Sequence, residues 1–128
     1  MIEGGCFCGA VRYGIDDHAY RAVNCHCTMC RRIHAAPFVT WLVVPLNRFR
    51  YLRTDGLVPL QSSAAGTRYH CSRCGTHVAC INSGHPDIVD VALGSLDDPA
   101  RFTASFEVFT DTRLPGVAAT VQDSSTGA

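Results

Sequence analysis

The sequence predicts a mostly β domain, and three observations support this prediction. Apolar and polar residues alternate over short segments, which is the pattern of strands that bury one face. Glycine and proline recur about every ten residues, as expected where hairpins connect short strands. No segment sustains the 3.6-residue period of a long amphipathic helix.

The individual elements follow from the same patterns. Residues 10–15 alternate apolar with polar or small side chains, which predicts a half-buried strand. Residues 36–45 form a nearly continuous apolar run, rich in β-branched and aromatic side chains, which predicts a buried strand. Strands of similar composition are predicted at 48–52, 87–93 and 105–109, and helical turns only at 29–36 and 95–102.

Length and charge limit the possible classes of protein. A chain of 128 residues predicts one domain, which we place at residues 1–118, followed by a small, polar and flexible tail at 119–128. The 11 basic and 11 acidic residues balance, which argues against nucleic-acid and polybasic membrane partners. Without a long apolar run or a secretory signal at the N-terminus, we expect a soluble cytoplasmic protein whose thiols stay reduced. The oligomeric state is left open.

The eight cysteines are the most informative feature of the sequence. Seven of them lie in tight clusters, which suits metal binding because neighbouring sulfurs can converge on one ion. Structural disulfides more often join distant segments and are the less favoured alternative. Zinc is the default ion for such thiolate sets, with iron–sulfur as a lesser alternative. The seven clustered cysteines divide into four plus three, which predicts two Zn²⁺ ions per chain.

Two pairs of cysteines predict a closed, structural zinc site, formed by Cys6, Cys8, Cys71 and Cys74. Four thiolates around one Zn²⁺ leave net negative charge, so nearby donors should compensate it. The candidates are Arg73 and the backbone N–H groups of Gly9 and Gly75, where glycine permits the positive φ of a tight turn.

The remaining cluster predicts a second zinc site, formed by Cys25, Cys27 and Cys30. In an extended segment His26 points away from its two neighbouring cysteines, so we expect it to pair with another residue instead of the same ion. The fourth ligand stays undecided from spacing alone. The candidates are Cys80, His77 and His34, or an exogenous molecule at an open, reactive zinc.

The motifs together resemble the glutathione-dependent formaldehyde-activating enzyme family, which includes centromere protein V. They are "GGCFCGAVRY", "CHCTMCRR" followed by "APFVTW", "YHCSRCGT", "DVALGSLDDP" and "FTDTRLP", and they span roughly residues 3 to 116. The resemblance implies antiparallel sheets in a β-tent-like arrangement around the zinc sites. It also implies the same division of ligands, with Cys25, Cys27 and Cys30 at the catalytic zinc. Phe109 and Gly116 depart from the tryptophans of many relatives.

The resemblance implies a carbon–sulfur lyase acting in the synthetic direction, which joins glutathione to formaldehyde. A zinc held by three thiolates is suited to bind an exogenous thiol as thiolate. Arg31 and Arg32 follow the third ligand and are candidates for binding the carboxylates of glutathione. Two alternatives remain, a noncatalytic binding module with two structural zincs and a redox or metal sensor.

Overall fold

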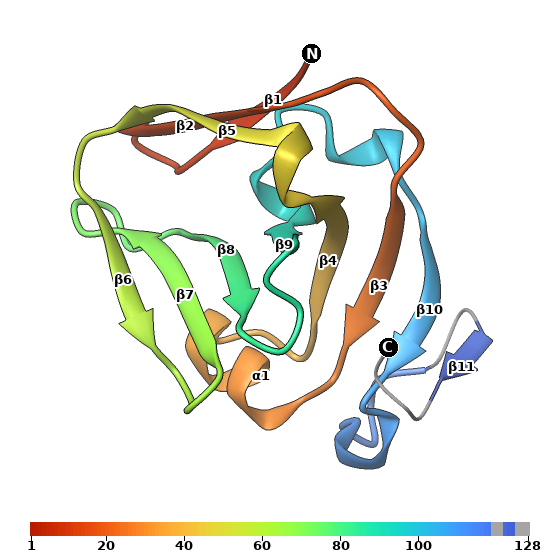
Figure 1. The fold of residues 1–128 in the computed structure, drawn as a ribbon. Coiled ribbons are helices and arrows are strands. Elements are labelled where there is room, and N and C mark those ends of the chain that lie inside the picture. The colour runs from red at the N-terminus through yellow and green to blue at the C-terminus, as the bar shows by residue number, and fades with distance from the viewer. Residues whose placement is uncertain (119–121, 125–128) are drawn as a thin grey trace.

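Strands dominate the computed structural model, which describes residues 1–118 and 122–124 (Figure 1). A three-stranded antiparallel sheet has the order β1 (Ile2–Gly5), β2 (Val11–Ile15) and β5 (Phe49–Thr54). A second sheet has eight strands in the order β11–β10–β3–β4–β9–β8–β7–β6. These strands are β3 (Arg21–Cys25), β4 (Val39–Pro45), β6 (Leu57–Gln61), β7 (Gly66–Cys71), β8 (His77–Asn82), β9 (Ile88–Ala92), β10 (Ala104–Val108) and β11 (Gln122–Ser124).

The arrangement confirms the predicted fold class, with one addition. In Figure 1 the small sheet lies across one end and the larger sheet extends from it on both sides, with the helix α1 (Thr28–His34) at the opposite end. The feature that the sequence did not predict is a pair of parallel contacts in the larger sheet. β10 pairs in parallel with both β3 and β11, whereas the other strand pairs of this sheet are antiparallel. Four short 3₁₀ helices complete the described elements, at Leu46–Arg48, Leu93–Ser95, Pro99–Arg101 and Thr110–Thr112.

The main core lies where the predicted alternation places it. In β2 the side chains of Val11, Tyr13 and Ile15 are fully buried. They pack in one cluster with residues of the larger sheet, including Leu42 and Val44 of β4. Burying each of these side chains contributes about 1.5–3 kcal/mol, so this cluster stabilises the contact between the two sheets.

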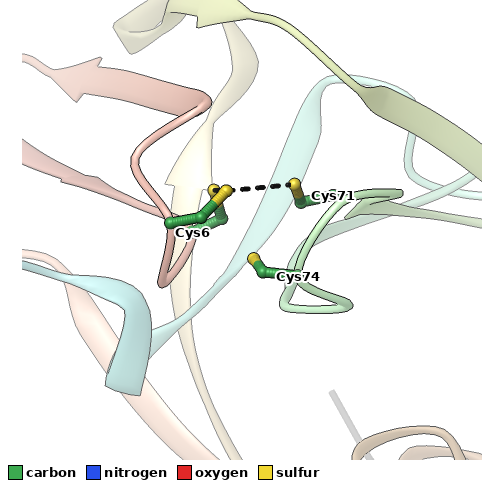
Figure 2. Close-up of side chains that lie close together, drawn as sticks. Cys6, Cys71 and Cys74 are labelled. Atoms are coloured by element: carbon green, nitrogen blue, oxygen red, sulfur yellow. Dashed lines mark hydrogen bonds between the residues drawn. The ribbon is translucent and has the colours of Figure 1, made fainter.

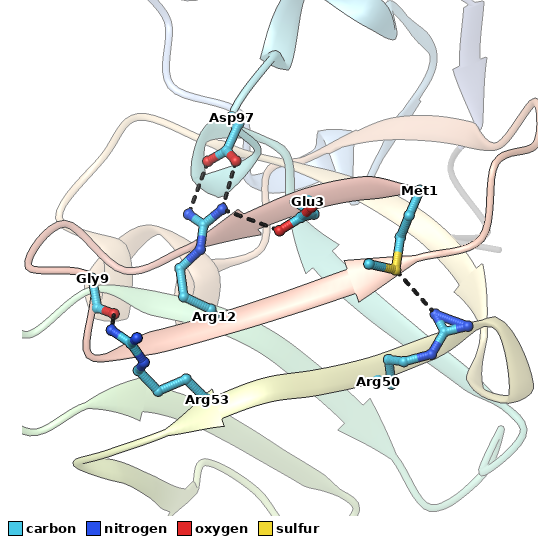
Figure 3. A network of polar contacts seen from close by, with 7 residues as sticks. All are labelled: Met1, Glu3, Gly9, Arg12, Arg50, Arg53 and Asp97. Carbon is cyan, nitrogen blue, oxygen red and sulfur yellow. Dashed lines mark hydrogen bonds and ion pairs between the residues drawn. The ribbon is translucent and has the colours of Figure 1, made fainter.

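Polar contacts attach the small sheet to the rest of the molecule (Figure 3). The guanidinium of Arg12 donates to both carboxylate oxygens of Asp97, at 2.9 and 2.6 Å, and lies 3.8 Å from Glu3. Within the small sheet, Arg53 of β5 donates to the carbonyl oxygen of Gly9 in the turn before β2, at 3.3 Å. Asp97 therefore fixes the position of β2, and its pKa is lowered mainly by this hydrogen bond from Arg12.

The helix α1 is short because its capping residues set both ends. Cys27 is the N-cap residue, and its sulfur accepts a hydrogen bond from the N–H of Cys30 at 3.2 Å. Ala35 ends the helix in the left-handed conformation, with φ 50°, and its N–H donates to the carbonyl oxygen of Arg31. The helical turn predicted at residues 29–36 is therefore confirmed.

The predicted tail lies mostly outside the described residues. Residues 119–121 and 125–128 are not described, and the backbone of Gln122–Ser124 pairs with β10.

Candidate metal centres

Four cysteine side chains from two separate turns converge on one point (Figure 2). Cys6 and Cys8 lie at the turn between β1 and β2, Cys71 ends β7, and Cys74 lies in the turn before β8. All four sulfurs lie within 4.8 Å of one another, with 3.6 Å between Cys6 and Cys8 and 3.8 Å between Cys8 and Cys71. Zn–S bonds of about 2.3 Å in a tetrahedron require about 3.8 Å between sulfurs. The donor set and its spacing therefore fit a zinc ion.

Backbone N–H groups surround this first cluster, and of the candidates named from the sequence Arg73 contributes its backbone N–H, whereas Gly9 and Gly75 do not. Gly9 and Gly75 have the expected positive φ, 82° and 83°, yet their N–H groups donate to the carbonyl oxygens of Cys6 and Cys71. The donors to sulfur are the N–H of Val11, 3.2 Å from Cys6, and the N–H of Arg73, 3.4 Å from Cys71. The glycines therefore shape the turns, and their neighbours along the chain stabilise the thiolates.

The second cluster forms where β3 meets the helix. Cys25 is the last residue of β3, Cys27 caps α1, and Cys30 lies in the first turn of α1. Their sulfurs lie within 4.8 Å of one another, and those of Cys25 and Cys30 are 3.6 Å apart. Cys25 and Cys30 are buried, whereas Cys27 is partly exposed. Cys27 is therefore the cysteine of this cluster that is most exposed to solvent.

Within the described residues, no fourth histidine, cysteine or carboxylate lies within the same distance of all three sulfurs. Cys80 packs beside the cluster, and burial raises the pKa of its thiol to about 11, so it remains protonated at neutral pH. His34 and His77 lie side by side, with ring centroids 5.4 Å apart. Burial lowers the pKa of His34 to about 4 and also lowers that of His77, so both imidazoles are neutral at pH 7.

A buried arginine that sequence reasoning missed lies against the second cluster. Arg68 of β7 is 4% exposed, and both of its terminal nitrogens donate to the sulfur of Cys30 at 3.6 Å. Its guanidinium also lies 6.0 Å from the ring of Trp41. The available signal was a charged residue inside the strand-like segment GTRYHC, because buried charges in a sheet require a partner.

The three thiols of the second cluster influence one another. Hydrogen bonds from Cys25 and Cys30 lower the pKa of Cys27 to about 2, with a smaller contribution from the charge of Arg68. The hydrogen bonds to Cys27 and Cys30 raise the pKa of Cys25. These contacts favour the thiolate form of Cys27, and binding an ion releases the protons that the other thiols carry.

Comparison with known proteins identifies the family. A family model described as "Glutathione-dependent formaldehyde-activating enzyme" matches residues 1–112. The chain belongs to this family. A protein of Halomonas elongata named "Putative glutathione-dependent formaldehyde-activating enzyme" is 28% identical over 109 residues, which cover 76% of this chain and 66% of the relative. The chain thus spans just under two thirds of that relative's length.

The family assignment confirms the resemblance that the motifs indicated, and the fold agrees. The crystal structure of a Rhodobacter sphaeroides protein matches with a TM-score of 0.63 at 20% identity, covering 95% of this chain and 99% of the other. The family match includes both cysteine clusters and Arg68. In the described residues, no helix has the length and apolar character needed to cross a membrane.

In this family member the two arginines that follow Cys30 take different places. Arg31 donates to the carbonyl oxygen of Thr112 at 2.8 Å, which ties α1 to the segment after β10. Arg32 is exposed on the helix. The structure therefore gives Arg31 a structural contact, and it gives Cys30 a different cationic neighbour, Arg68.

A cavity of about 870 Å³ borders the first cluster through Cys6, and no cysteine of the second cluster lines it. Val39 and Ala92 border the cavity and belong to the same apolar cluster as Cys25 and Cys30. Its lining also includes His34, Ile33, Phe38, Thr40, His77 and Cys6.

Proposed function

We propose that the chain is a zinc-dependent carbon–sulfur lyase that adds a glutathione-type thiol to a small aldehyde such as formaldehyde, and reverses that addition. The family membership supports the substrates. The observation that carries the proposal is the convergence of three cysteine sulfurs, with no fourth protein donor at the same distance among the described residues. We further propose that Cys25, Cys27 and Cys30 hold the reactive Zn²⁺ and that the four-cysteine cluster holds a structural one.

The chemistry follows from the donor set. A zinc ion held by three thiolates lowers the pKa of an additional thiol and keeps it nucleophilic. The thiol gives up its proton, its sulfur forms a bond to the aldehyde carbon, and the carbonyl oxygen takes up a proton. The product is a hemithioacetal, which carries an S-hydroxymethyl group when the aldehyde is formaldehyde. Cleavage of the C–S bond is the same process in reverse.

The residues of the chain contribute access, charge and shielding. The partly exposed Cys27 leaves one side of the cluster open to a small thiol. Arg68 offsets the negative charge that three thiolates add, which favours a further anionic sulfur nearby. Val39, Trp41 and Val108 pack around Cys25 and Cys30 and exclude water from the buried side. Arg31 and Arg32 remain candidates for contacting the carboxylates of the thiol.

The burial of Cys25 and Cys30 also supports a second candidate, a noncatalytic module whose two zincs are both structural. One experiment separates the two. The exchange rate between glutathione and formaldehyde is measured by NMR with zinc-loaded protein, with the Cys27→Ser variant, and without protein, because the adduct also forms unaided. The proposal predicts a faster exchange with the zinc-loaded wild type alone. Equal rates in all three samples would favour the noncatalytic module.

A further inference from the structure

The residue between two cysteines of the second cluster is held by three hydrogen bonds from one segment. His26 is fully buried between Cys25 and Cys27. Its backbone N–H donates to the carbonyl oxygen of Val108 at 3.0 Å, and its carbonyl oxygen accepts from the hydroxyl of Thr112 at 2.8 Å. Both partners belong to β10 or the turn that follows it, so this segment fixes the backbone of the cysteine loop.

The third bond involves a buried carboxylate. Nε2 of His26 lies 2.6 Å from Oε1 of Glu107, which is 1% exposed. The other oxygen of Glu107 accepts from the side-chain amide of Asn24 at 2.7 Å, and Asn24 in turn accepts from the hydroxyl of Thr40 at 2.6 Å. Three neighbouring strands, β3, β10 and β4, therefore contribute to one buried chain of hydrogen bonds that ends at His26.

A buried carboxylate has a specific consequence at this position. A buried charge is unfavourable unless partners compensate it, and here both carboxylate oxygens are paired. The hydrogen bond between His26 and Glu107 holds the residue that lies between Cys25 and Cys27. Because successive side chains of an extended backbone point to opposite sides, fixing the imidazole on one side orients the two adjacent cysteines on the other.

We propose that Glu107 is a positioning residue for the second metal site. Through His26 it holds the loop so that the sulfurs of Cys25 and Cys27 converge with that of Cys30. The inference rests on the proposed function in one respect, since it takes this cluster to be a metal site. It goes further by assigning a role to a carboxylate that is distant in sequence and does not contact the sulfurs in any described hydrogen bond.

The test compares metal binding by Glu107→Gln and by wild type. Glutamine has nearly the same size but carries an NH₂ donor in place of one carboxylate oxygen, so one of the two bonds, to Asn24 or to His26, loses its acceptor. Losing the hydrogen-bond partner of a metal ligand typically lowers metal affinity by about 10- to 100-fold, and because Glu107 acts through His26, the lower end of about 10-fold applies here. We expect that loss for the second Zn²⁺, measured by competition with a chromophoric chelator, with the first ion unaffected. We also expect a changed visible absorption spectrum of the Co²⁺-loaded second site.

The control variant is Glu3→Gln, because Glu3 is an exposed acid 3.8 Å from Arg12 and should leave both ions and the spectrum unchanged. A milder variant, Thr112→Val, removes only the hydroxyl that bonds the carbonyl of His26 and should cause a smaller loss in the same direction. If Glu107→Gln does not fold, the zinc affinity of Thr112→Val tests the proposal in its place.

Two results would overturn the proposal. One is wild-type affinity and an unchanged cobalt spectrum in the folded variants. The other is a lower melting temperature with unchanged second-site affinity and spectrum, which would mean that the network only stabilises the fold. Neither measurement uses thiol or aldehyde, so a failure of the proposed reaction is distinguishable from a failure of this inference.

Discussion

Arg68→Met removes the buried cation that contacts the second cysteine cluster. Both terminal nitrogens of Arg68 lie 3.6 Å from the sulfur of Cys30. Hydrogen bonds that involve a charged group contribute about 1.5–3 kcal/mol, and methionine fills a similar volume without the charge. A loss of about 1.5–3 kcal/mol corresponds to roughly 12- to 140-fold in affinity, at about 1.4 kcal/mol per factor of ten. We therefore expect the second Zn²⁺ to bind that much more weakly.

The same substitution should change the pH dependence of metal binding. The charge of Arg68 is one cause that keeps the pKa of Cys27 low, after its hydrogen bonds from Cys25 and Cys30. Without this charge the zinc ion must displace more protons from the cysteines. The pH at which half of the second sites hold zinc should therefore rise.

The assay is chelator competition for the second zinc over a range of pH. Arg32→Met is the matched control, because it removes an exposed arginine near Cys30 in the same helix. Equal zinc affinity and pH dependence for Arg68→Met and wild type would refute the role assigned to Arg68.

Three further predictions follow. Cys71→Ser should release the first zinc and unfold the chain, as measured by circular dichroism. The binding free energy of a structural zinc, about 10–16 kcal/mol, matches or exceeds the net free energy of unfolding of a small domain. A folded variant would contradict a structural role. Cys80→Ser should keep both zincs, since the sulfur of Cys80 is not among those that lie within 4.8 Å of one another in either cluster, and elemental analysis that finds one zinc lost would identify Cys80 as a ligand. Burial raises the pKa of Asp90 from 3.8 to about 6, so the folded state favours the protonated carboxyl and this stability is lost as pH rises through 6. At about 1.4 kcal/mol per pH unit, this rise in the pKa of Asp90 predicts that Asp90→Asn stabilises by about 2–3 kcal/mol more at pH 8 than at pH 4. Denaturant unfolding at both values checks this, and an equal effect at both would contradict it.

Strands with clear alternation or a long apolar run could be predicted, but several others could not. β2 and β4 show the burial that their patterns indicate. β1 escaped prediction because it contains Gly4 and Gly5, and glycine is unfavourable in strands. Both are needed here, since an added Cβ would lie 2.4 Å from the hydroxyl of Tyr13 and 2.2 Å from the carbonyl oxygen of Val11.

The edge strand β6 and the parallel pairing of β10 have similar explanations. Pro59 argues against a strand, but β6 is the last strand of its sheet, where a missing N–H is tolerated. The parallel position of β10 beside β3 depends on pairing between segments about 80 residues apart, which local patterns do not encode.

The candidate metal ligands could be grouped from sequence because each pair or triplet of cysteines is closely spaced, although the first cluster joins two pairs that lie 63 residues apart. Their surroundings could not. Arg68 is 38 residues from Cys30, and Glu107 is 81 residues from His26, so only the folded sheet brings these charges to the site. The prediction that His26 pairs with a neighbour is confirmed, but its partner could not be named from the sequence.

X-ray absorption at the zinc edge, on protein loaded with two zinc ions, tests the account most directly. A four-sulfur site and a three-sulfur site with one lighter donor average about 3.5 sulfurs per zinc. The account predicts that value for the protein alone and a rise to about 4 when glutathione is added. An average of about 4 sulfurs before any thiol is added would mean that the second ion is already enclosed by protein, and it would contradict the proposed reaction.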